Sequence, residues 1–397
     1  MAENKQNEYP NVPPLRFPEF SEPWERKKLS CFLYENKERN KTDFFSKEDV
    51  LSVSGDLGIV NQIELLGRSF AGKSVKDYHV VRNGNIVYTK SPLKEYPYGI
   101  IKYNRGIDGI VSTLYAVYHV LDNADGRFIE FYFSDKGRIN RYLKPIVRIG
   151  AKHDMKIGNE EVLDNYVVMP SLVEQDKIAT FIELLNKRIA VQSKLIEDLK
   201  QLKSALVERL YSQHNPNCRI GDLFVQVSKR NHGNNDYSVL SVNNRLGFIE
   251  QSEQFEERSV ASDDTSNYKV VSRDDFAYNP ARINVGSIAR LTSFENGIVS
   301  PMYICFHTKK QLLPQYLEHF FDTRYFHYEM QKRLEGSVRL CLSWEGLCNI
   351  PIAVPPIEQQ EKVGKRISRL ADKISLEERH IDLLKSQKQY LLQAMFI

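Results

Sequence analysis

The chain has 397 residues, 42% of them hydrophobic and 27% charged, which predicts two or three globular domains with cores of their own. No apolar run of roughly 18 residues occurs, so we expect no membrane span, and the first residues are polar and proline-rich, unlike a secretory signal. The five cysteines show no CxxC spacing, so we expect no cysteine metal site but reduced thiols in a cytoplasmic protein. A net charge of +4 permits nucleic-acid binding without favouring it, so any basic surface must be local.

Residues 1–20 are expected to form an N-terminal arm, and a mixed α/β region follows from 21 to 169. Short β-type runs in this region are separated by Gly, Asn and Asp. The aromatic, amphipathic stretch Arg127–Leu143 predicts one helix packed on the sheet. The β-type runs are Val50–Val53, His79–Val81, Asn85–Tyr88, Gly99–Tyr103 and Ile110–Val120.

Residues 170–212 predict one long helix. From Ile178 to Leu210, seam residues alternate steps of four and three, which is a heptad pattern, and the polar residues Gln192 and Lys203 interrupt it. At 1.5 Å per residue the helix would be about 50 Å long. Pro170 precedes it, as helix starts allow.

This stretch occurs a second time at residues 355–397, without a gap and displaced by 185 positions. Its polar breaks, Glu377 and Lys388, fall in register with those of the first copy. Two core helices of an ordinary domain are one interpretation, and repetition of this length with matched breaks favours a paired coiled coil.

The mixed regions 21–169 and 213–354 are also related. Val-Leu-Ser-Val begins at Val50 and again at Val239, and Gly-Ile-Val-Ser begins at Gly109 and again at Gly297. The chain is therefore a tandem duplication of a globular domain followed by a long helix. Between the shared blocks the loops diverge, which suits two copies that hold one fold and recognise different targets.

Enzyme motifs are missing. The sequence has no phosphate-binding GxxxxGK[ST] loop, no nuclease-type carboxylate cluster and no His spacing typical of a metal site. Asn279–Arg282 resembles the Asn-Pro-Pro-aromatic loop of DNA amino-methyltransferases, but the aromatic residue that would stack on a flipped base is absent.

Cations interleaved with aromatic and amide side chains indicate a surface suited to DNA, because Lys and Arg neutralise phosphates while Arg, Asn and Gln pair with base edges. An ordinary polar loop is the alternative at each place, and the matched location in both halves favours DNA. Structural turns are the alternative for the loops just before the long helices. The candidates are Lys73, Lys90, Ser91, Lys94, Tyr96, Tyr98, Ser112, Lys152 and His153 in the first half, and Tyr278, Asn279, Arg282, Asn284, Ser300, Ser337 and Arg339 in the second.

These features together resemble the specificity subunit (HsdS) of type I restriction-modification systems over nearly the full length. The resemblance is carried by Pro14-Leu15-Arg16-Phe17-Pro18 with Trp24, by Tyr-x-Val-Val followed by Gly-Ile-Val-Ser in each half, and above all by the junction Pro-x-x-x-Glu-Gln-x-Lys-Ile at Pro170–Ile178. The second junction, Pro355–Val363, departs slightly and keeps Gln360 and Lys362.

The resemblance implies an α+β fold built as a tandem pseudo-two-fold repeat. Residues 21–169 and 213–354 would be α/β target recognition domains, each of which recognises one half of a split, asymmetric DNA site. Residues 170–212 and 355–397 would be conserved spacer helices that pair as an antiparallel coiled coil, set the half-site spacing and dock two methyltransferase subunits. Restriction subunits would join that core. This chain would be non-catalytic and without cofactor, because S-adenosylmethionine, ATP and Mg belong to its partners.

Two other functions stay open: a coiled-coil two-domain adaptor or DNA-binding scaffold outside restriction, and a DNA methyltransferase. If the helices pair antiparallel about residues 197 and 382, Lys203 lies opposite Glu377 and Gln192 opposite Lys388. We expect the Lys203–Glu377 pair to determine the register, with Gln192 and Lys388 as its companions or as docking residues.

Overall fold

The computed structural model describes residues 11–93, 95–149, 155–232, 237–244, 246–254, 264–337 and 339–397. These residues fall into two compact units. Unit 1 combines residues up to Val191 with His380–Ile397, and unit 2 is Gln192–Arg379. Each unit therefore holds one mixed α/β domain and a part of both long helices, α4 (Leu172–Tyr211) and α9 (Ile357–Ala394). The predicted domain boundaries stay a prediction.

The domain of unit 1 is built on a four-stranded antiparallel sheet in the order β2-β9-β6-β7. Two antiparallel pairs, β3-β4 and β5-β8, lie beside it, and β1 pairs with β12 where the domain meets α4. Its strands are β1 (Glu25–Lys28), β2 (Leu33–Glu35), β3 (Leu51–Ser54), β4 (Gly58–Asn61), β5 (His79–Val81), β6 (Ile86–Thr89), β7 (Ile101–Tyr103), β8 (Gly109–Val111), β9 (Tyr115–Val120), β10 (Arg148–Ile149), β11 (Met155–Lys156) and β12 (Tyr166–Met169), and its short helices are α1 (Gln62–Leu66), α2 (Gly126–Tyr132) and α3 (Lys136–Leu143).

The domain of unit 2 repeats this plan with two four-stranded sheets, ordered β14-β21-β18-β19 and β16-β15-β20-β17. The second sheet is mixed, because β15 runs parallel to β20. Its strands are β13 (Cys218–Arg219), β14 (Phe224–Val227), β15 (Val239–Asn243), β16 (Gly247–Glu250), β17 (Lys269–Ser272), β18 (Phe276–Tyr278), β19 (Ile288–Arg290), β20 (Asn296–Val299), β21 (Ile304–Thr308) and β22 (Pro351–Ile352), and its short helices are α5 (Gln251–Gln254), α6 (Pro314–Phe320), α7 (Arg324–Gln331) and α8 (Trp344–Cys348).

The repeated Gly-Ile-Val-Ser motif has a packing role in both domains. A Cβ atom on Gly109 would lie 2.6 Å from the Asp49 carbonyl oxygen and 2.8 Å from Leu51 Cγ. A Cβ atom on Gly297 would meet the side chain of Leu240, which is the counterpart of Leu51. Only glycine lets these strands approach so closely, which explains why the Gly-Ile-Val-Ser glycine occurs together with the Val-Leu-Ser-Val leucine in each half.

Two sequence expectations need correction. The run Ile110–Val120 is two strands, β8 and β9, separated by a turn in which Tyr115 N–H donates to the Ser112 carbonyl at 3.0 Å. The stretch Arg127–Leu143 is two helices, because the Asp135 carboxylate accepts a hydrogen bond from Arg138 N–H at 2.8 Å and so starts a new helix.

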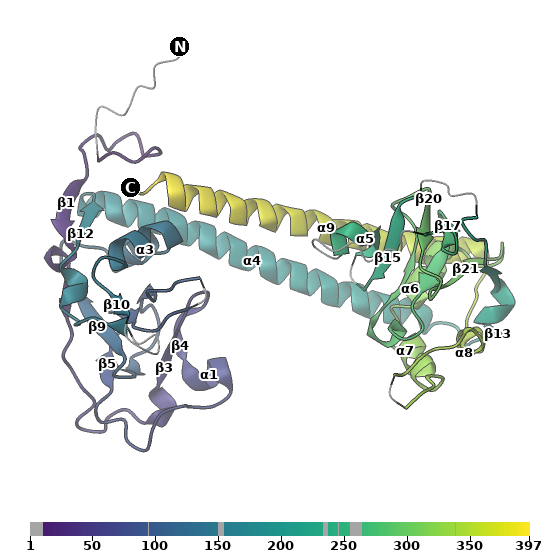
Figure 1. The fold of residues 1–397 in the computed structure, drawn as a ribbon, viewed down its shortest axis with the longest axis horizontal. Helices are drawn as coiled ribbons and strands as arrows, with labels where there is room; N and C mark the ends of the chain where they lie inside the picture. Colours follow the sequence, from purple (N-terminus) through teal and green to yellow (C-terminus); the bar gives the residue numbers. More distant parts are fainter. Residues whose placement is uncertain are drawn as a thin grey trace, which may run out of the picture. The chain divides into compact units, whose positions relative to one another are not determined.

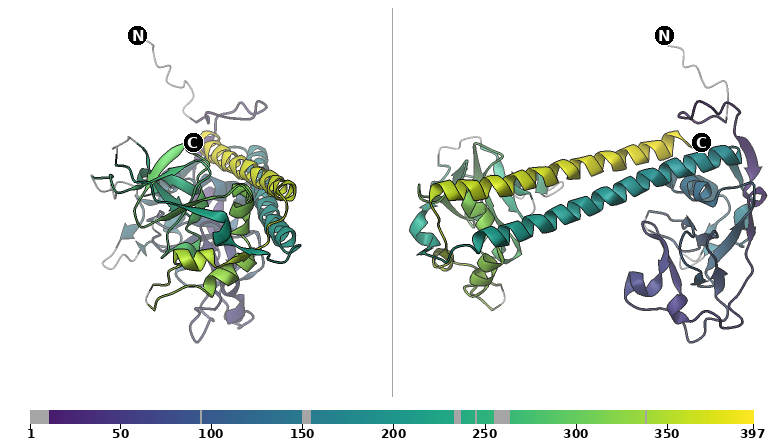
Figure 2. Two further views of the ribbon diagram at one scale, coloured as in Figure 1. Left: turned by 90° about the vertical axis from the view of Figure 1, so that its right-hand side faces the viewer. Right: turned by 180° about the vertical axis from the view of Figure 1, so that it is seen from behind.

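Within each unit, a segment of α4 lies beside a segment of α9 that runs in the opposite direction (Figure 1, Figure 2). In unit 1, Ile178 and Ile182 of α4 share a core with Leu391 and Met395 near the end of α9. In unit 2, Val207 and Leu210 near the end of α4 pack with Ile367. The antiparallel pairing of the predicted fold is therefore confirmed.

The predicted register was wrong. Glu377 accepts a hydrogen bond from the Gln192 side-chain amide, and both residues are buried, at 8% and 9% exposure. Lys203 instead forms an ion pair with Asp322 at 3.5 Å. The partner of Glu377 is thus eleven residues, or about three helical turns, from the expected one. Both positions belong to the same seam, so apolar spacing alone did not distinguish the two registers.

Lys388, the counterpart of Lys203, lies half-buried in unit 1. With Lys102 and Glu130 it lines a cavity of about 630 Å³. Burial and the nearby Lys102 ammonium lower the pKa of Lys388, and Glu130 opposes them.

Candidate nucleic-acid interface

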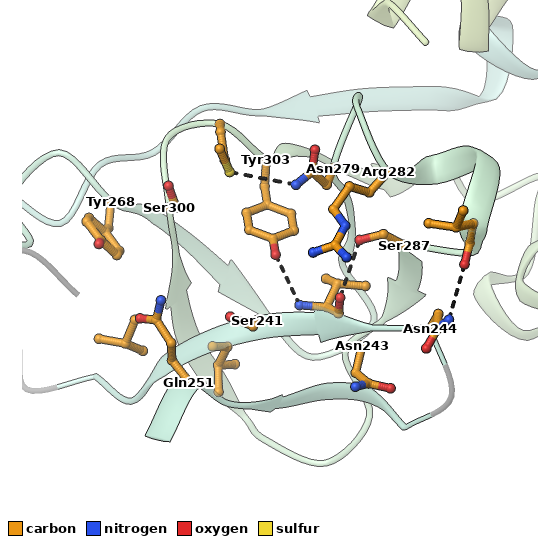
Figure 3. A pocket seen from close by; sticks show the side chains of 15 residues that line it. Ser241, Asn243, Asn244, Gln251, Tyr268, Asn279, Arg282, Ser287, Ser300 and Tyr303 are labelled. Carbon is orange, nitrogen blue, oxygen red and sulfur yellow. Dashed lines mark hydrogen bonds between the residues drawn. The ribbon is translucent and has the colours of Figure 1, made fainter. Parts of the chain in front are cut away.

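Unit 2 contains an open recess of about 430 Å³ beside strand β15 (Figure 3). The strand β15, the turn after it, the loop after β18 and the turn after β20 all contribute side chains. Amide, guanidinium and hydroxyl groups make up its polar lining, and aromatic, thioether and aliphatic side chains form the rest of the wall. Its polar and aromatic lining consists of Ser241, Asn243, Asn244, Gln251, Tyr268, Asn279, Arg282, Ser287, Ser300 and Tyr303, and Met302 lies beside them.

Hydrogen bonds connect β15 and the residue after it to the loops on the other side of the recess. The Tyr303 hydroxyl accepts from Val242 N–H at 3.4 Å, and the Ser287 hydroxyl donates to the Val242 carbonyl at 3.3 Å. The Asn244 amide donates to the Val285 carbonyl at 3.3 Å. The loop opposite the strand is thus tied to it at several points, which pre-organises the groups between them.

Arg282 projects from a tight turn at the edge of the recess. Its N–H donates to the Asn279 carbonyl at 3.0 Å, and its carbonyl accepts from Ser287 N–H at 3.1 Å. Gly286 closes the turn with a φ of 92°, a conformation that favours glycine. The turn is therefore fixed by main-chain contacts, while the Arg282 side chain is exposed.

The chemistry of the recess suits the edges of nucleic-acid bases. An arginine fork donates two parallel hydrogen bonds, and Asn and Gln amides offer a donor and an acceptor side by side. The Gln251 carbonyl oxygen is buried without a hydrogen-bond partner among the described residues. A buried acceptor of this kind costs free energy until a ligand or water supplies a donor.

The second-half candidates fall into three positions. Asn279, Arg282 and Ser300 line the recess, and Asn284 is exposed on the same turn as Arg282. Tyr278 is fully buried, and its hydroxyl donates to the Leu342 carbonyl at 3.3 Å, so it supports the wall from within the core instead of meeting a ligand. Burial also raises the pKa of Tyr278.

Ser337 and Arg339 are exposed on the loop between the paired residues Glu335 and Cys341. The end of this loop joins the Arg282 loop, because Leu342 N–H donates to the Pro280 carbonyl at 3.0 Å. The two candidate loops of the second half are therefore neighbours, although they are far apart in the sequence.

In the first half the candidates are more enclosed. Lys90 donates to the Asn159 side chain, and burial lowers the pKa of its ammonium. Ser91, Tyr96 and Tyr98 are half-buried. The remaining described candidates are Lys73, which is exposed, and Ser112, which is half-buried at the turn equivalent to that of Ser300. Lys94, Lys152 and His153 lie outside the described residues.

Sequence reasoning missed Asn243, Asn244 and Gln251. Asn243 and Asn244 directly follow the repeated Val-Leu-Ser-Val block, and Gln251 starts α5. A signal was available, because two adjacent amides after an apolar strand mark a turn at the end of that strand.

Among the residues that the structure describes, no group of three or more His, Cys, Asp or Glu side chains could hold a metal ion. The part of the chain with assigned structure also contains no helix both long and apolar enough to cross a membrane.

No family model and no curated protein sequence matches the chain. Solved structures do match. The S subunit of a type I restriction-modification system from M. genitalium has a TM-score of 0.57 at 14% identity, covering 97% of this chain and 99% of that one. This chain has the fold of a type I S subunit. A chain from a study of complex assembly and conformational transition of the type I R-M system agrees, with a TM-score of 0.54 at 15% identity over 94% of this chain and 96% of that one. The S-subunit fold includes both mixed domains and both long helices, so the predicted fold class is confirmed.

Proposed function

We propose that this chain is the DNA specificity subunit of a type I restriction-modification enzyme. The observation that carries the proposal is the S-subunit fold over nearly the whole chain, joined to a polar recess built for base edges. Each recognition domain binds one half of a bipartite, asymmetric target. The helical pair α4–α9 determines the spacing between the two half-sites.

The loops explain why the two half-sites differ. Arg282 is exposed on a turn held by main-chain contacts, whereas Lys90, on the corresponding loop of the first domain, is half-buried against Asn159. An exposed guanidinium matches the O6 and N7 atoms of guanine, while an ammonium is a point charge better suited to one acceptor. The same framework thus presents different chemistry at the two ends of the target.

The catalytic work belongs to partner subunits. Both long helices carry exposed apolar side chains at seven-residue spacing outside the seam: Leu184 and Val191 on α4, and Leu376, Leu383 and Tyr390 on α9. Apolar side chains that repeat along the exposed side of a helix suit a protein interface. We assign them to two methyltransferase subunits, which bind S-adenosylmethionine and modify adenine. Restriction subunits, with ATP and Mg, complete the enzyme, and this chain needs no cofactor of its own.

The proposal is tested on the full chain in complex with the methyltransferase subunit of its own system. Methylation of a host genome should then occur at one bipartite sequence. Failure to form a stable complex, or methylation without a common sequence, would overturn the proposal.

Arg282→Ala tests the recess within that complex. If Arg282 contacts a base, discrimination should relax at one position of one half-site, by about ten-fold to a hundred-fold. If it contacts a phosphate, binding to all sequences should weaken and the salt slope should fall by about 0.9. Lys310→Ala, which removes another exposed cation of unit 2, is the matched control. Binding and sequence preference identical to the parent would refute the assignment of the recess.

A further inference from the structure

A buried glutamine in the first turn of each long helix makes the same contacts in both units. Gln175 of α4 and Gln360 of α9 are each 1% exposed. The Gln175 amide donates to the Pro170 carbonyl at 2.9 Å, and the Gln360 amide donates to the Pro355 carbonyl at 2.8 Å. Each glutamine thereby ties the start of its helix to the proline five residues before it.

The carbonyl oxygen of each glutamine contacts the globular domain. In unit 1, Gln175 accepts from Asp125 N–H at 2.9 Å, and Asp125 is the N-cap residue of α2. In unit 2, Gln360 accepts from Leu313 N–H at 2.8 Å, and Leu313 is the N-cap residue of α6. Gln360 also donates to the Gln311 carbonyl at 2.9 Å. The same side chain therefore joins three segments: the linker, the long helix and a helix of the domain.

About two helical turns further along each long helix, a second contact supports the first in each unit. In unit 1, Arg127 of α2 donates to Glu183 of α4 at 3.1 Å and also pairs with Asp176 at 2.6 Å. In unit 2, the Gln315 amide of α6 donates to the Ser368 hydroxyl of α9 at 2.6 Å. The contact has the same place in both units, but it is ionic in the first and neutral in the second.

Glutamine is the residue type that this place requires. It must offer a donor to one or two main-chain carbonyls and an acceptor to a main-chain N–H at the same time. Glutamate would turn an acceptor toward the Pro355 and Gln311 carbonyls, and alanine would leave buried polar groups without partners, at about 1–3 kcal/mol each. The hydrogen-bond partners of both amides among the described residues are main-chain atoms, so these contacts fix backbone against backbone.

We propose that Gln175 and Gln360 are positioning residues that set the angle between each recognition domain and the helix that leaves it. The consequence, which rests on the function proposed above, is that they determine how strictly the enzyme measures the spacer between half-sites. With this glutamine clasp intact (the contacts of Gln175 in unit 1 and of Gln360 in unit 2), each domain has one orientation on its helix. With the glutamine contacts removed, apolar packing and the remaining contacts hold the domain over a wider range of angles, so a target with one base pair more or less in its spacer becomes acceptable. The effect is larger in unit 2, because the contact that follows the glutamine is neutral there and ionic in unit 1.

The experiment uses the complex of the full chain with its methyltransferase subunit and duplexes whose spacers differ by one base pair in either direction. For Gln360→Ala, the preference for the correct spacer should fall about ten-fold, while preference among half-site sequences stays as in the parent. Gln359→Ala, which changes the exposed neighbour, should leave the spacer preference unchanged. Gln175→Ala should also lower the preference for the correct spacer, but by less than Gln360→Ala.

Two further measurements keep the outcome interpretable. Ser368→Ala removes the supporting contact from a half-buried site and should relax spacer preference without unfolding unit 2, so it replaces Gln360→Ala if that variant does not fold. A folded Gln360→Ala or Ser368→Ala complex with the spacer preference of the parent would overturn the inference. A parent complex that binds no bipartite target would instead refute the proposed function, so the two failures are distinguishable.

Discussion

Replacing Glu377 by leucine should destabilise the coiled coil of unit 2 more than replacing both Glu377 and Gln192. In the parent, the buried Gln192 amide donates to the buried Glu377 carboxylate in the seam. The single change removes the carboxylate acceptor and leaves that amide with only the main-chain carbonyl of residue 377, at 3.4 Å, which costs about 1–3 kcal/mol. The Lys373 ammonium also loses Glu377, but its side chain is 52% exposed and is hydrated at little cost.

The double variant Gln192→Leu/Glu377→Leu removes both polar groups and leaves an apolar seam. Its stability should match or exceed that of the parent, because replacing a buried polar pair by packed apolar side chains is often neutral or stabilising by about 1–4 kcal/mol. The coupling between the two sites should therefore be about 2 kcal/mol or more in magnitude, obtained from a double-mutant cycle measured by urea unfolding of the full chain.

Lys200 and Glu378 provide a matched control. They also form an inter-helix pair in unit 2, at 2.6 Å, but their side chains are 57% and 45% exposed. A cycle to alanine at these sites should give a coupling of at most about 0.5 kcal/mol. A Gln192–Glu377 coupling as small as that of the control would refute the reasoning, since it would mean that the two residues do not contact each other in solution.

Two further predictions concern the domains. Gly109→Ala should lower the free energy of unfolding by about 1–3 kcal/mol, because its Cβ would lie 2.6 Å from the Asp49 carbonyl oxygen. Gly55→Ala, whose Cβ would have no atom within 4 Å, should be tolerated. Chemical unfolding measures both variants, and equal effects would contradict the packing argument. Burial lowers the pKa of His79 and of His319 to about 4, so acidification protonates these side chains in the unfolded chain first. Their share of stability is fully present above about pH 6.5 and should be lost as the pH falls to about 4, at up to about 3 kcal/mol each, and His79→Gln should flatten the pH dependence of urea unfolding.

The internal duplication made most of the fold predictable from the sequence. Two copies of Val-Leu-Ser-Val and of Gly-Ile-Val-Ser marked equivalent strands, and two copies of the heptad seam marked the long helices. Local capping was harder to see. Asp135 starts α3 within an amphipathic stretch that looked continuous, because a single N-cap residue outweighs the periodicity around it.

Register and recess depend on tertiary structure and could be predicted only in part. A seam that repeats every seven residues is compatible with several antiparallel registers, and the buried Gln192–Glu377 pair became visible only in the folded chain. Arg282 and Asn279 were identified as candidates from their loop. Gln251 was not, because the β15–β16 hairpin and α5 bring it to a site formed by distant loops.

The two halves share the glutamine contacts and differ in their exposed groups. Main-chain bonds hold the Arg282 turn, and the glutamine clasps join backbone to backbone, so neither support depends on which side chains the loop exposes. A substitution at an exposed loop position therefore changes the chemistry offered to a target at little cost in stability, since surface changes outside such contacts stay within about 0.5 kcal/mol. Under the proposed function, a substitution at Gln175 or Gln360 would change where that chemistry is presented. Target sequence and target geometry would then be carried by separate residues, and variants in the recess and at the two glutamines test the two roles independently.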